Sequence, residues 1–213
     1  MQKYDTIIFD LDGTLLDTLP DLTDAVNYAM KQLCYPTHSI DEVLGFVGNG
    51  IRKTIERSVP PNASQEQIEQ ALTFFREYYF SHLTVKTKPF GGIMELLRAL
   101  HGRGVKMGIA SNKADFAVQQ LNNHFFSGLD MIALGESPTM PRKPAPDMVA
   151  QLCQILNSKN VLYVGDSDTD VQTARNAGVE QISVLWGYRS RQQLEQAGAE
   201  RFIERPSEIF DIL

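Results

Sequence analysis

The sequence predicts an α/β fold in which a parallel sheet carries an inserted helical cap. Two observations lead to this class. Short apolar runs alternate with amphipathic stretches over most of the 213 residues, and this alternation is typical of strand and helix units around a parallel sheet. One long interval, residues 16–88, contains helical patterns without a convincing strand. That interval is far longer than an ordinary connection between a strand and a helix.

Four apolar runs are expected to form buried strands, at residues 6–9, 105–110, 161–164 and 181–185. Short continuous apolar runs of this kind indicate strands that are covered on both faces of a parallel sheet. A weaker run at residues 129–134 is a candidate for a fifth strand.

Helical periodicity follows in the segments between these strands, at residues 92–101, 114–124, 146–157 and 168–177. In the first of these segments, apolar residues from Ile93 to Leu100 recur with the spacing of one helix face. Such a face is expected to pack on the sheet.

The interrupting interval contains four more helical patterns, at residues 19–33, 40–46, 51–58 and 65–80. We therefore predict two domains, one formed by residues 1–15 and 89–213 and one, the cap, formed by residues 16–88. Two linkers, near residues 15–18 and 86–89, would join the cap to the sheet domain. Because both adjoin the polar segments described below, closure of the cap could exclude water from a site there.

Composition and charge exclude several classes of partner. The formal net charge is −6 and the pI is about 5.2, which argues against a nucleic acid held by its phosphates. The apolar runs are too short to cross a membrane. The first residues carry no apolar signal segment, so a cytoplasmic location is expected.

The two cysteines, Cys34 and Cys153, lie in no metal or redox motif and are expected to be reduced. Either a monomer or a homodimer is compatible with the sequence.

A pair of carboxylates follows the first predicted strand, in the segment Asp10-Leu11-Asp12-Gly13-Thr14. Residues two apart on an extended segment point to the same side, so Asp10 and Asp12 converge. Open α/β sheets bind ligands at this carboxyl end of their strands. Two carboxylates held together are costly without a cation. In isolation the same pattern is also common in loops, where the aspartates cap turns.

Two other strand ends carry polar residues. The run at residues 161–164 leads into Asp166, Asp168 and Asp170, and the run at residues 105–110 leads into Ser111 and Asn112. The acidic group is not an EF-hand loop, because no glycine occupies its turn position and no glutamate closes it.

A lysine lies between these two segments of the chain. Lys143 is followed by Pro144 and Pro146, which stiffen its loop. Acids for a metal, donors for an oxyanion and a fixed cation are the groups that phosphoryl transfer requires.

The four segments resemble, in the same order, the four motifs of the haloacid dehalogenase superfamily. They are the segment from Asp10 to Thr14, then Ser111, Lys143, and the segment from Asp166 to Asp170. The chain is most similar to the phosphoglycolate phosphatase-like branch, in the segments Pro20-Asp21-Leu22, Gly48-Asn49-Gly50, Ser111-Asn112-Lys113 and Trp186-Gly187-Tyr188. The resemblance implies a Rossmann-like parallel sheet core with an inserted α-helical cap.

The resemblance also implies the catalytic roles. Asp10 would be the nucleophile that forms an aspartyl-phosphate, and Asp12 would act as general acid and then as general base. Mg²⁺ would be held by Asp10, by the backbone carbonyl of Asp12 and by Asp166. Ser111 and Lys143 would hold the phosphoryl oxygens, with Lys143 also restraining Asp10.

The roles of the remaining motif residues have alternatives. Asp170 is expected to orient Lys143 or a metal-bound water, and Asp168 is its competitor for a place near the metal. Thr14 either orients Asp12 or caps the following segment. Asn112 either contacts the phosphate or serves as a turn residue.

In the cap, Gly48, Asn49 and Gly50 precede a predicted helix that carries Arg52. Free amides at a helix start bind anions, so we predict that Gly48, Asn49 and Arg52 contact the non-phosphate end of the substrate. The alternative is an ordinary helix start with solvated charges.

The expected function is therefore Mg²⁺-dependent hydrolysis of a small-molecule phosphate ester, with phosphoglycolate as the first candidate. Three alternatives remain open at this stage. They are a β-phosphoglucomutase-like phosphosugar mutase, in which an aliphatic residue usually stands in the place of Thr14, a pyrophosphatase of the same superfamily, and a protein of this fold that only binds.

Overall fold

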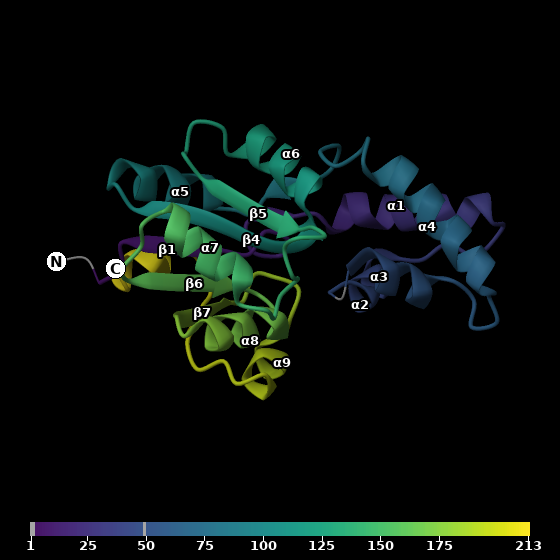
Figure 1. The fold of residues 1–213 in the computed structure, drawn as a ribbon. Coiled ribbons are helices and arrows are strands. Elements are labelled where there is room, and N and C mark those ends of the chain that lie inside the picture. Colours follow the sequence, from purple (N-terminus) through teal and green to yellow (C-terminus); the bar gives the residue numbers. More distant parts are fainter. Residues whose placement is uncertain (1–2, 49) are drawn as a thin grey trace. The chain divides into compact units, whose positions relative to one another are not determined.

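A computed structural model of the chain describes residues 3–48 and 50–213 (Figure 1). The chain divides into two compact units, which we call the core unit (Met1–Asp17 with Pro89–Leu213) and the cap unit (Thr18–Lys88). The first boundary follows Asp17 rather than residue 15, because Leu16 is buried and its amide donates a hydrogen bond to the carbonyl of Leu11.

The core unit is built on a six-stranded sheet in the order β5-β4-β1-β6-β7-β8, and each neighbouring pair of strands is parallel. This confirms the predicted Rossmann-like α/β core. The strands are β1 (Thr6–Phe9), β4 (Lys106–Ala114), β5 (Ile132–Glu136), β6 (Val161–Gly165), β7 (Glu180–Val184) and β8 (Phe202–Ile203). Two further short strands, β2 (Leu16–Asp17) and β3 (Lys88–Pro89), pair separately.

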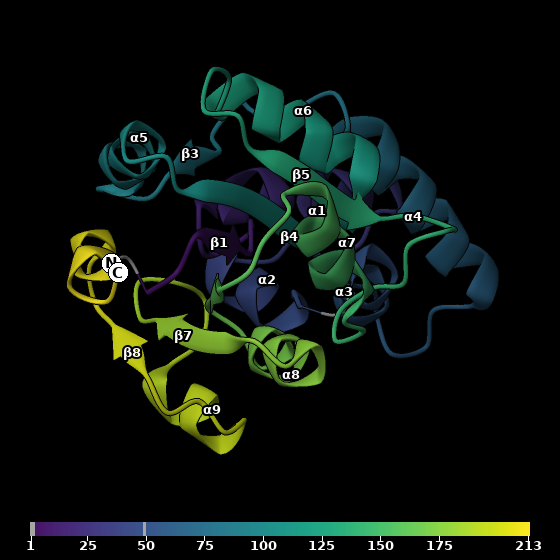
Figure 2. The same cartoon turned by 60° about the vertical axis from the view of Figure 1, so that its left-hand side comes forward.

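Helices cover both faces of this sheet. Figures 1 and 2 show α5 (Ile93–Gly102) and α6 (Asp115–Phe125) on one face, with α7 (Asp147–Ile155) and α8 (Asp168–Ala177) on the other. Every residue of β1 is buried, which explains why the strand has a continuous apolar sequence rather than an alternating one. Three short elements near the C-terminus had not been predicted: β8, α9 (Arg191–Gln196) and a 3₁₀ helix (Pro206–Asp211).

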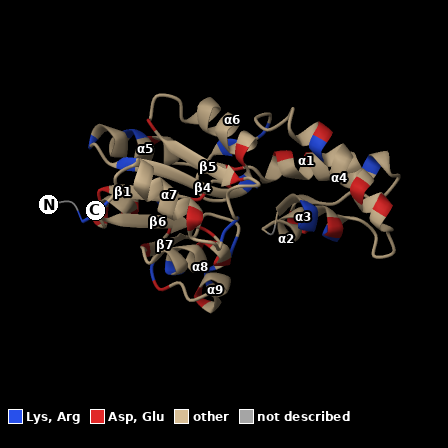
Figure 3. Cartoon of the chain, viewed as in Figure 1, with Lys and Arg blue, Asp and Glu red and all other residues tan. Residues whose placement is uncertain are grey.

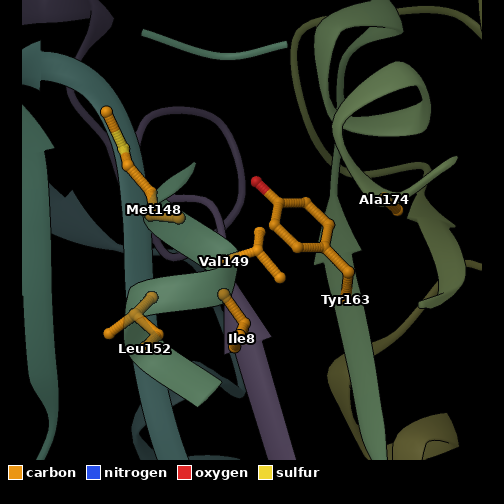
Figure 4. Close-up of a cluster of buried hydrophobic side chains, with 7 residues drawn as sticks. Ile8, Met148, Val149, Leu152, Tyr163 and Ala174 are labelled. Atoms are coloured by element: carbon orange, nitrogen blue, oxygen red, sulfur yellow. The ribbon is translucent and has the colours of Figure 1, made fainter. Parts of the chain in front are cut away.

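One buried cluster joins the central strands to α7 and α8 (Figure 4). Ile8 and Tyr163 face each other across β1 and β6, and they pack against side chains of both helices. The cluster consists of Ile8, Ala110, Met148, Val149, Leu152, Tyr163 and Ala174. This packing fixes the position of β6 beside β1, and the chain's acidic segments follow directly after these two strands.

The cap unit contains the four predicted helices, α1 (Leu19–Gln32), α2 (Ile40–Phe46), α3 (Gly50–Ser58) and α4 (Gln65–Tyr79). Ser39 and Ser64 begin α2 and α4 with reciprocal capping hydrogen bonds, each of which satisfies amides that a helix start leaves free. Asp21, buried in the first turn of α1, accepts hydrogen bonds from the backbone amides of Lys86 and Thr87. This carboxylate ties the two ends of the cap unit together.

Acidic and basic residues are interspersed along the cap helices (Figure 3). Three ion pairs illustrate this mixing: Arg52–Glu69, Lys53–Glu56 and Lys86–Asp24. None of the helices in the described part of the chain has the length and apolar character that crossing a membrane requires.

Candidate active site

The site forms where the central parallel strands end. β1 lies between β4 and β6, and Phe9 is level with both Ile109 and Val164. The next residue along β1, Asp10, keeps this register, because its amide donates a 2.9 Å hydrogen bond to the carbonyl of Val164. Residues that follow the three strands therefore gather at the carboxyl edge of the sheet, where open α/β sheets bind ligands.

Lys143 lies at the centre of this group of residues and is only 4% exposed. Its Nζ donates to Asp10 Oδ1 at 2.6 Å, to Asp170 Oδ1 at 2.7 Å and to the Tyr163 hydroxyl at 3.0 Å. An ammonium group has three N–H bonds, so each of them has an acceptor. Burial alone lowers the pKa of Lys143, but the carboxylates of Asp10 and Asp170 outweigh it and hold this pKa well above its usual value.

The Tyr163 hydroxyl is a member of the site that the sequence analysis missed. Its ring packs in the apolar cluster, and its oxygen points away from Ile8 and Leu152 (Figure 4). The hydroxyl accepts from Lys143 and donates to Asp170 Oδ1 at 2.9 Å. A buried tyrosine hydroxyl generally needs a partner, so a tyrosine two residues before Gly165 in an aliphatic strand was the available signal.

Asp170 is held from two sides. Its Oδ1 accepts from Lys143 and Tyr163, and its Oδ2 accepts from the amide and the hydroxyl of Ser167, at 3.0 and 2.6 Å. With both oxygens engaged, this carboxylate serves best as an anchor for Lys143. Asp168 lies apart from this group, with a half-exposed side chain 4.0 Å from Arg189.

Asp166 is buried and is oriented by uncharged donors. The Thr14 hydroxyl donates to Oδ1 at 3.1 Å, and the Tyr188 amide donates to Oδ2 at 2.7 Å. Thr14 was expected either to orient Asp12 or to cap the following segment; in the structure its hydroxyl contacts Asp166, the predicted metal ligand. Burial raises the pKa of Asp166 to about 7, and the charge of Asp170 acts in the same direction.

The segment from Trp186 to Tyr188 closes around Asp166. The Trp186 indole donates to the carbonyl of Thr14 at 3.0 Å, beside the contact that the Tyr188 amide makes. A Cβ atom at Gly13 or at Gly187 would collide with the Asp166 side chain. Glycine at both positions therefore allows the backbone to enclose this carboxylate.

Three of these carboxylates form a donor set for a metal ion. One oxygen each from Asp10, Asp166 and Asp170 lies within 4.8 Å of the others. Carboxylate oxygens suit a hard divalent cation such as Mg²⁺, and one ammonium cannot neutralise three carboxylates. Burial raises the pKa of Asp10 well above its usual value despite the opposing charge of Lys143, and a bound cation would favour its ionised form. The residues present therefore fit a divalent metal.

The Asp12 side chain is engaged by a lysine that had not been singled out. Lys113 Nζ lies 2.7 Å from Asp12 Oδ1, and the two side chains are 5% and 21% exposed. The metal ligation predicted for Asp12 involves its backbone carbonyl and stays a prediction. The only sequence signal for Lys113 was its place in the segment Ser111-Asn112-Lys113.

Ser111 and Asn112 lie in β4 where its register against β5 shifts, between Ala110 and Ala114. Ser111 is buried, and its oxygen accepts from the Lys113 amide at 3.2 Å. The Asn112 carboxamide exchanges two hydrogen bonds with the backbone of Lys143, at 2.7 and 3.0 Å. Asn112 is thus a support for the Lys143 loop, and its contact with a phosphate stays a prediction.

The predicted substrate contacts in the cap are described within that unit alone. Gly48 has a φ of 125°, and Arg52 pairs with Glu69 at 2.8 Å with both side chains roughly half exposed. Asn49 lies outside the described residues. That this loop contacts a substrate stays a prediction.

The profile of the haloacid dehalogenase-like hydrolase family matches residues 7–184. The chain belongs to this family. A phosphoglycolate phosphatase of Aquifex aeolicus is 30% identical over 210 residues, covering 97% of this chain and 95% of that protein. One of Thiobacillus denitrificans is 32% identical over 191 residues, covering 85% and 83%.

A similar fold is found in a crystal structure from Lactobacillus delbrueckii subsp. bulgaricus, named as a candidate phosphoglycolate phosphatase. It has a TM-score of 0.92 and 34% sequence identity, covering 100% of this chain and 98% of that one. These findings confirm the expected membership of the phosphoglycolate phosphatase-like branch of haloacid dehalogenase hydrolases. The protein is a phosphatase rather than a protein of this fold that only binds.

Replacing Tyr163 with Phe should lower the turnover of this haloacid dehalogenase-like phosphatase about tenfold, with little change in KM. The substitution removes one acceptor of Lys143 and one donor to Asp170, and a hydrogen bond to a charged group contributes about 1.5–3 kcal/mol. Steady-state phosphate release measures the effect. Tyr4→Phe, which removes a hydroxyl contact to Glu180, is the matched control and should keep wild-type turnover. Equal turnover in both variants would contradict a positioning role for Tyr163.

Metal binding should strengthen as pH rises through 7. The folded protein keeps the Asp166 proton up to its pKa of about 7, whereas an unfolded chain loses it near the ordinary aspartate pKa of 3.8, so the stability of the metal-free protein falls as pH rises from about 4 to 7. Protons compete with the cation, and Mg²⁺ affinity should weaken about tenfold per pH unit below 7. The rise in melting temperature on adding Mg²⁺ should be larger at about pH 8 than at about pH 6. Asp166→Asn should remove that rise, and a larger rise at the lower pH would contradict the account.

Proposed function

We propose that this chain is a Mg²⁺-dependent phosphomonoesterase that hydrolyses phosphoglycolate through a phosphoryl group carried on Asp10. The observation that carries the proposal is the buried ammonium of Lys143, held against Asp10 at the carboxyl end of β1 and beside Asp166 and Asp170. Nucleophile, cation and metal donor set are thereby gathered at one edge of the sheet.

The first step would be attack by an Asp10 oxygen on phosphorus. A bond forms between that oxygen and phosphorus while the bond from phosphorus to the ester oxygen breaks. Asp12 gives a proton to the departing ester oxygen. Lys143 keeps Asp10 oriented through the 2.6 Å contact and places positive charge beside the phosphoryl oxygens, with the Ser111 hydroxyl as a further donor.

The second step would be hydrolysis of the aspartyl-phosphate. Asp12 removes a proton from a water molecule, which attacks phosphorus and releases inorganic phosphate with Asp10 restored. A cation held by Asp10, Asp166 and the Asp12 carbonyl would supply further neutralisation of phosphoryl charge. Asp170 is paired with the ammonium of Lys143, whereas Asp166 accepts from the neutral donors Thr14 and Tyr188, and this difference favours Asp166 over Asp170 as a ligand.

The choice of phosphoglycolate is supported by the names of the relatives that cover nearly the whole chain. Phosphatases of one fold act on different esters, so the substrate is the finer part of the proposal.

Phosphate release should be measured on phosphoglycolate, pyrophosphate, sugar phosphates and nucleotides, each with Mg²⁺ and with a chelator. We expect phosphoglycolate to be cleaved fastest and only with the metal. Asp10→Asn should reduce turnover by roughly four orders of magnitude or more, as loss of a catalytic nucleophile does. The matched control is Asp211→Asn, an exposed carboxylate in the 3₁₀ helix, which should retain activity.

The nucleophile, the metal and the substrate can each be rejected by a separate result. Turnover by Asp10→Asn close to the wild-type rate would reject the nucleophile, and turnover in the chelator would reject the metal. Faster cleavage of pyrophosphate, or isomerisation of a phosphosugar without phosphate release, would replace the substrate with one of the alternatives from the sequence.

A further inference from the structure

The ion pair between Lys113 and Asp12 lies next to the reacting groups, yet the two proposed steps leave Lys113 without a role. Lys113 Nζ is 2.7 Å from Asp12 Oδ1, and its side chain is 5% exposed. Asp12 comes two residues after the nucleophile, and its carboxyl must reach the ester oxygen that departs. With Asp12 in its proposed role, its partner Lys113 is on the leaving-group side of the site, whereas Lys143 contacts Asp10.

The proposed role of Asp12 as a general acid conflicts with its ion pair to Lys113. Once the Asp12 carboxyl turns to the ester oxygen, Lys113 gives up a buried ion pair. Separating a buried ammonium from its carboxylate is costly unless another anion replaces it. An anionic group on the leaving part of the substrate would be such a replacement.

Phosphoglycolate carries an anion in the required place, because a single methylene group separates its carboxylate from the ester oxygen. We propose that Lys113 binds the carboxylate of the substrate in exchange for Asp12, so that one lysine both selects an acidic leaving group and releases Asp12 for catalysis. The inference rests on the proposed function, and it places part of the substrate selectivity in the core unit.

Contacts in the cap are compatible with this assignment. Arg52, the cation that the sequence suggested for the non-phosphate end of the substrate, is paired with Glu69 at 2.8 Å in a partly exposed site. Exposed pairs of this kind are weak, so Arg52 could still exchange partners. Binding of the substrate carboxylate by Lys113 and its binding by Arg52 are therefore competing assignments, and they predict different results for variants of the two residues.

The test compares phosphoglycolate with two phosphate esters in which a neutral group replaces the carboxylate, phosphoglycolamide and 2-hydroxyethyl phosphate. The wild type should prefer phosphoglycolate by about 10- to 100-fold in kcat/KM, the range expected for one hydrogen-bonded ion pair. In Lys113→Met this preference should collapse, chiefly through loss of kcat/KM on phosphoglycolate. Lys113→Arg, which keeps the charge, should retain most of it.

Two further variants separate Lys113 from other cations. Lys106→Met, the control, removes a lysine from the start of β4, where its ammonium contacts the carbonyl of Asn157, and it should keep the wild-type preference. Arg52→Ala tests the competing assignment of the carboxylate to the cap arginine, and the proposal expects the preference to survive it. Collapse of the preference in Arg52→Ala but not in Lys113→Met would overturn the proposal. An equal loss on all three esters in Lys113→Met would also overturn it, because Lys113 would then serve the phosphoryl group or Asp12 alone.

The wild-type comparison needs no variant, so it can overturn the inference even if Lys113→Met does not fold. A wild type that cleaves phosphoglycolamide as well as phosphoglycolate overturns the inference while leaving the phosphatase chemistry intact. A wild type that cleaves none of the three esters contradicts the proposed substrate instead. Calorimetry can then compare the binding of phosphoglycolate and phosphoglycolamide to Asp10→Asn and to the double variant that also carries Lys113→Met. The proposal predicts tighter binding of phosphoglycolate to Asp10→Asn and loss of this difference in the double variant.

Discussion

The active site depends on one buried cation. The ammonium of Lys143 contacts Asp10, Asp170 and Tyr163, which belong to the end of β1, the start of α8 and the strand β6. A buried ion is tolerated only when its hydrogen bonds are satisfied. This arrangement satisfies all three N–H groups of Lys143, and displacement of any of these elements would leave one N–H group of a buried cation without its acceptor. The same contact that orients the proposed nucleophile therefore also fixes three separate segments of the core unit.

Further contacts hold this centre from outside. Asn112 fixes the backbone of Lys143, and Ser167 fixes Asp170. Asp166 is positioned by Thr14 and Tyr188 through neutral donors, so the carboxylate group keeps an excess of negative charge. That excess is the physical reason why these residues suit a divalent metal. Lys113 and Asp12 form a separate ion pair, which in the proposed mechanism is exchanged for the substrate carboxylate.

The sequence predicted the parts of the fold and site that depend on local pattern. Continuous apolar runs identified the five long strands, and the acids and Lys143 were found because they follow strand ends or lie in a stiffened loop. Short elements such as β8 and α9 escaped notice because they show too little periodicity. The contact of Thr14 with Asp166 was not predicted, and Tyr163 and Lys113 were missed, because these contacts join residues separated by 20 to 152 positions. Only the folded sheet brings such residues together.

The central claim is that Asp10, restrained by Lys143, carries the phosphoryl group during turnover. A reaction with phosphoglycolate and Mg²⁺ that is quenched within the first turnovers and reduced with borohydride tests it directly, because an acyl phosphate is reduced and a free carboxylate is not. Mass spectrometry of the peptide that contains Asp10 and Asp12 should show homoserine at position 10 alone. Unmodified Asp10 in an enzyme that is releasing phosphate, or homoserine at position 12, would contradict the account.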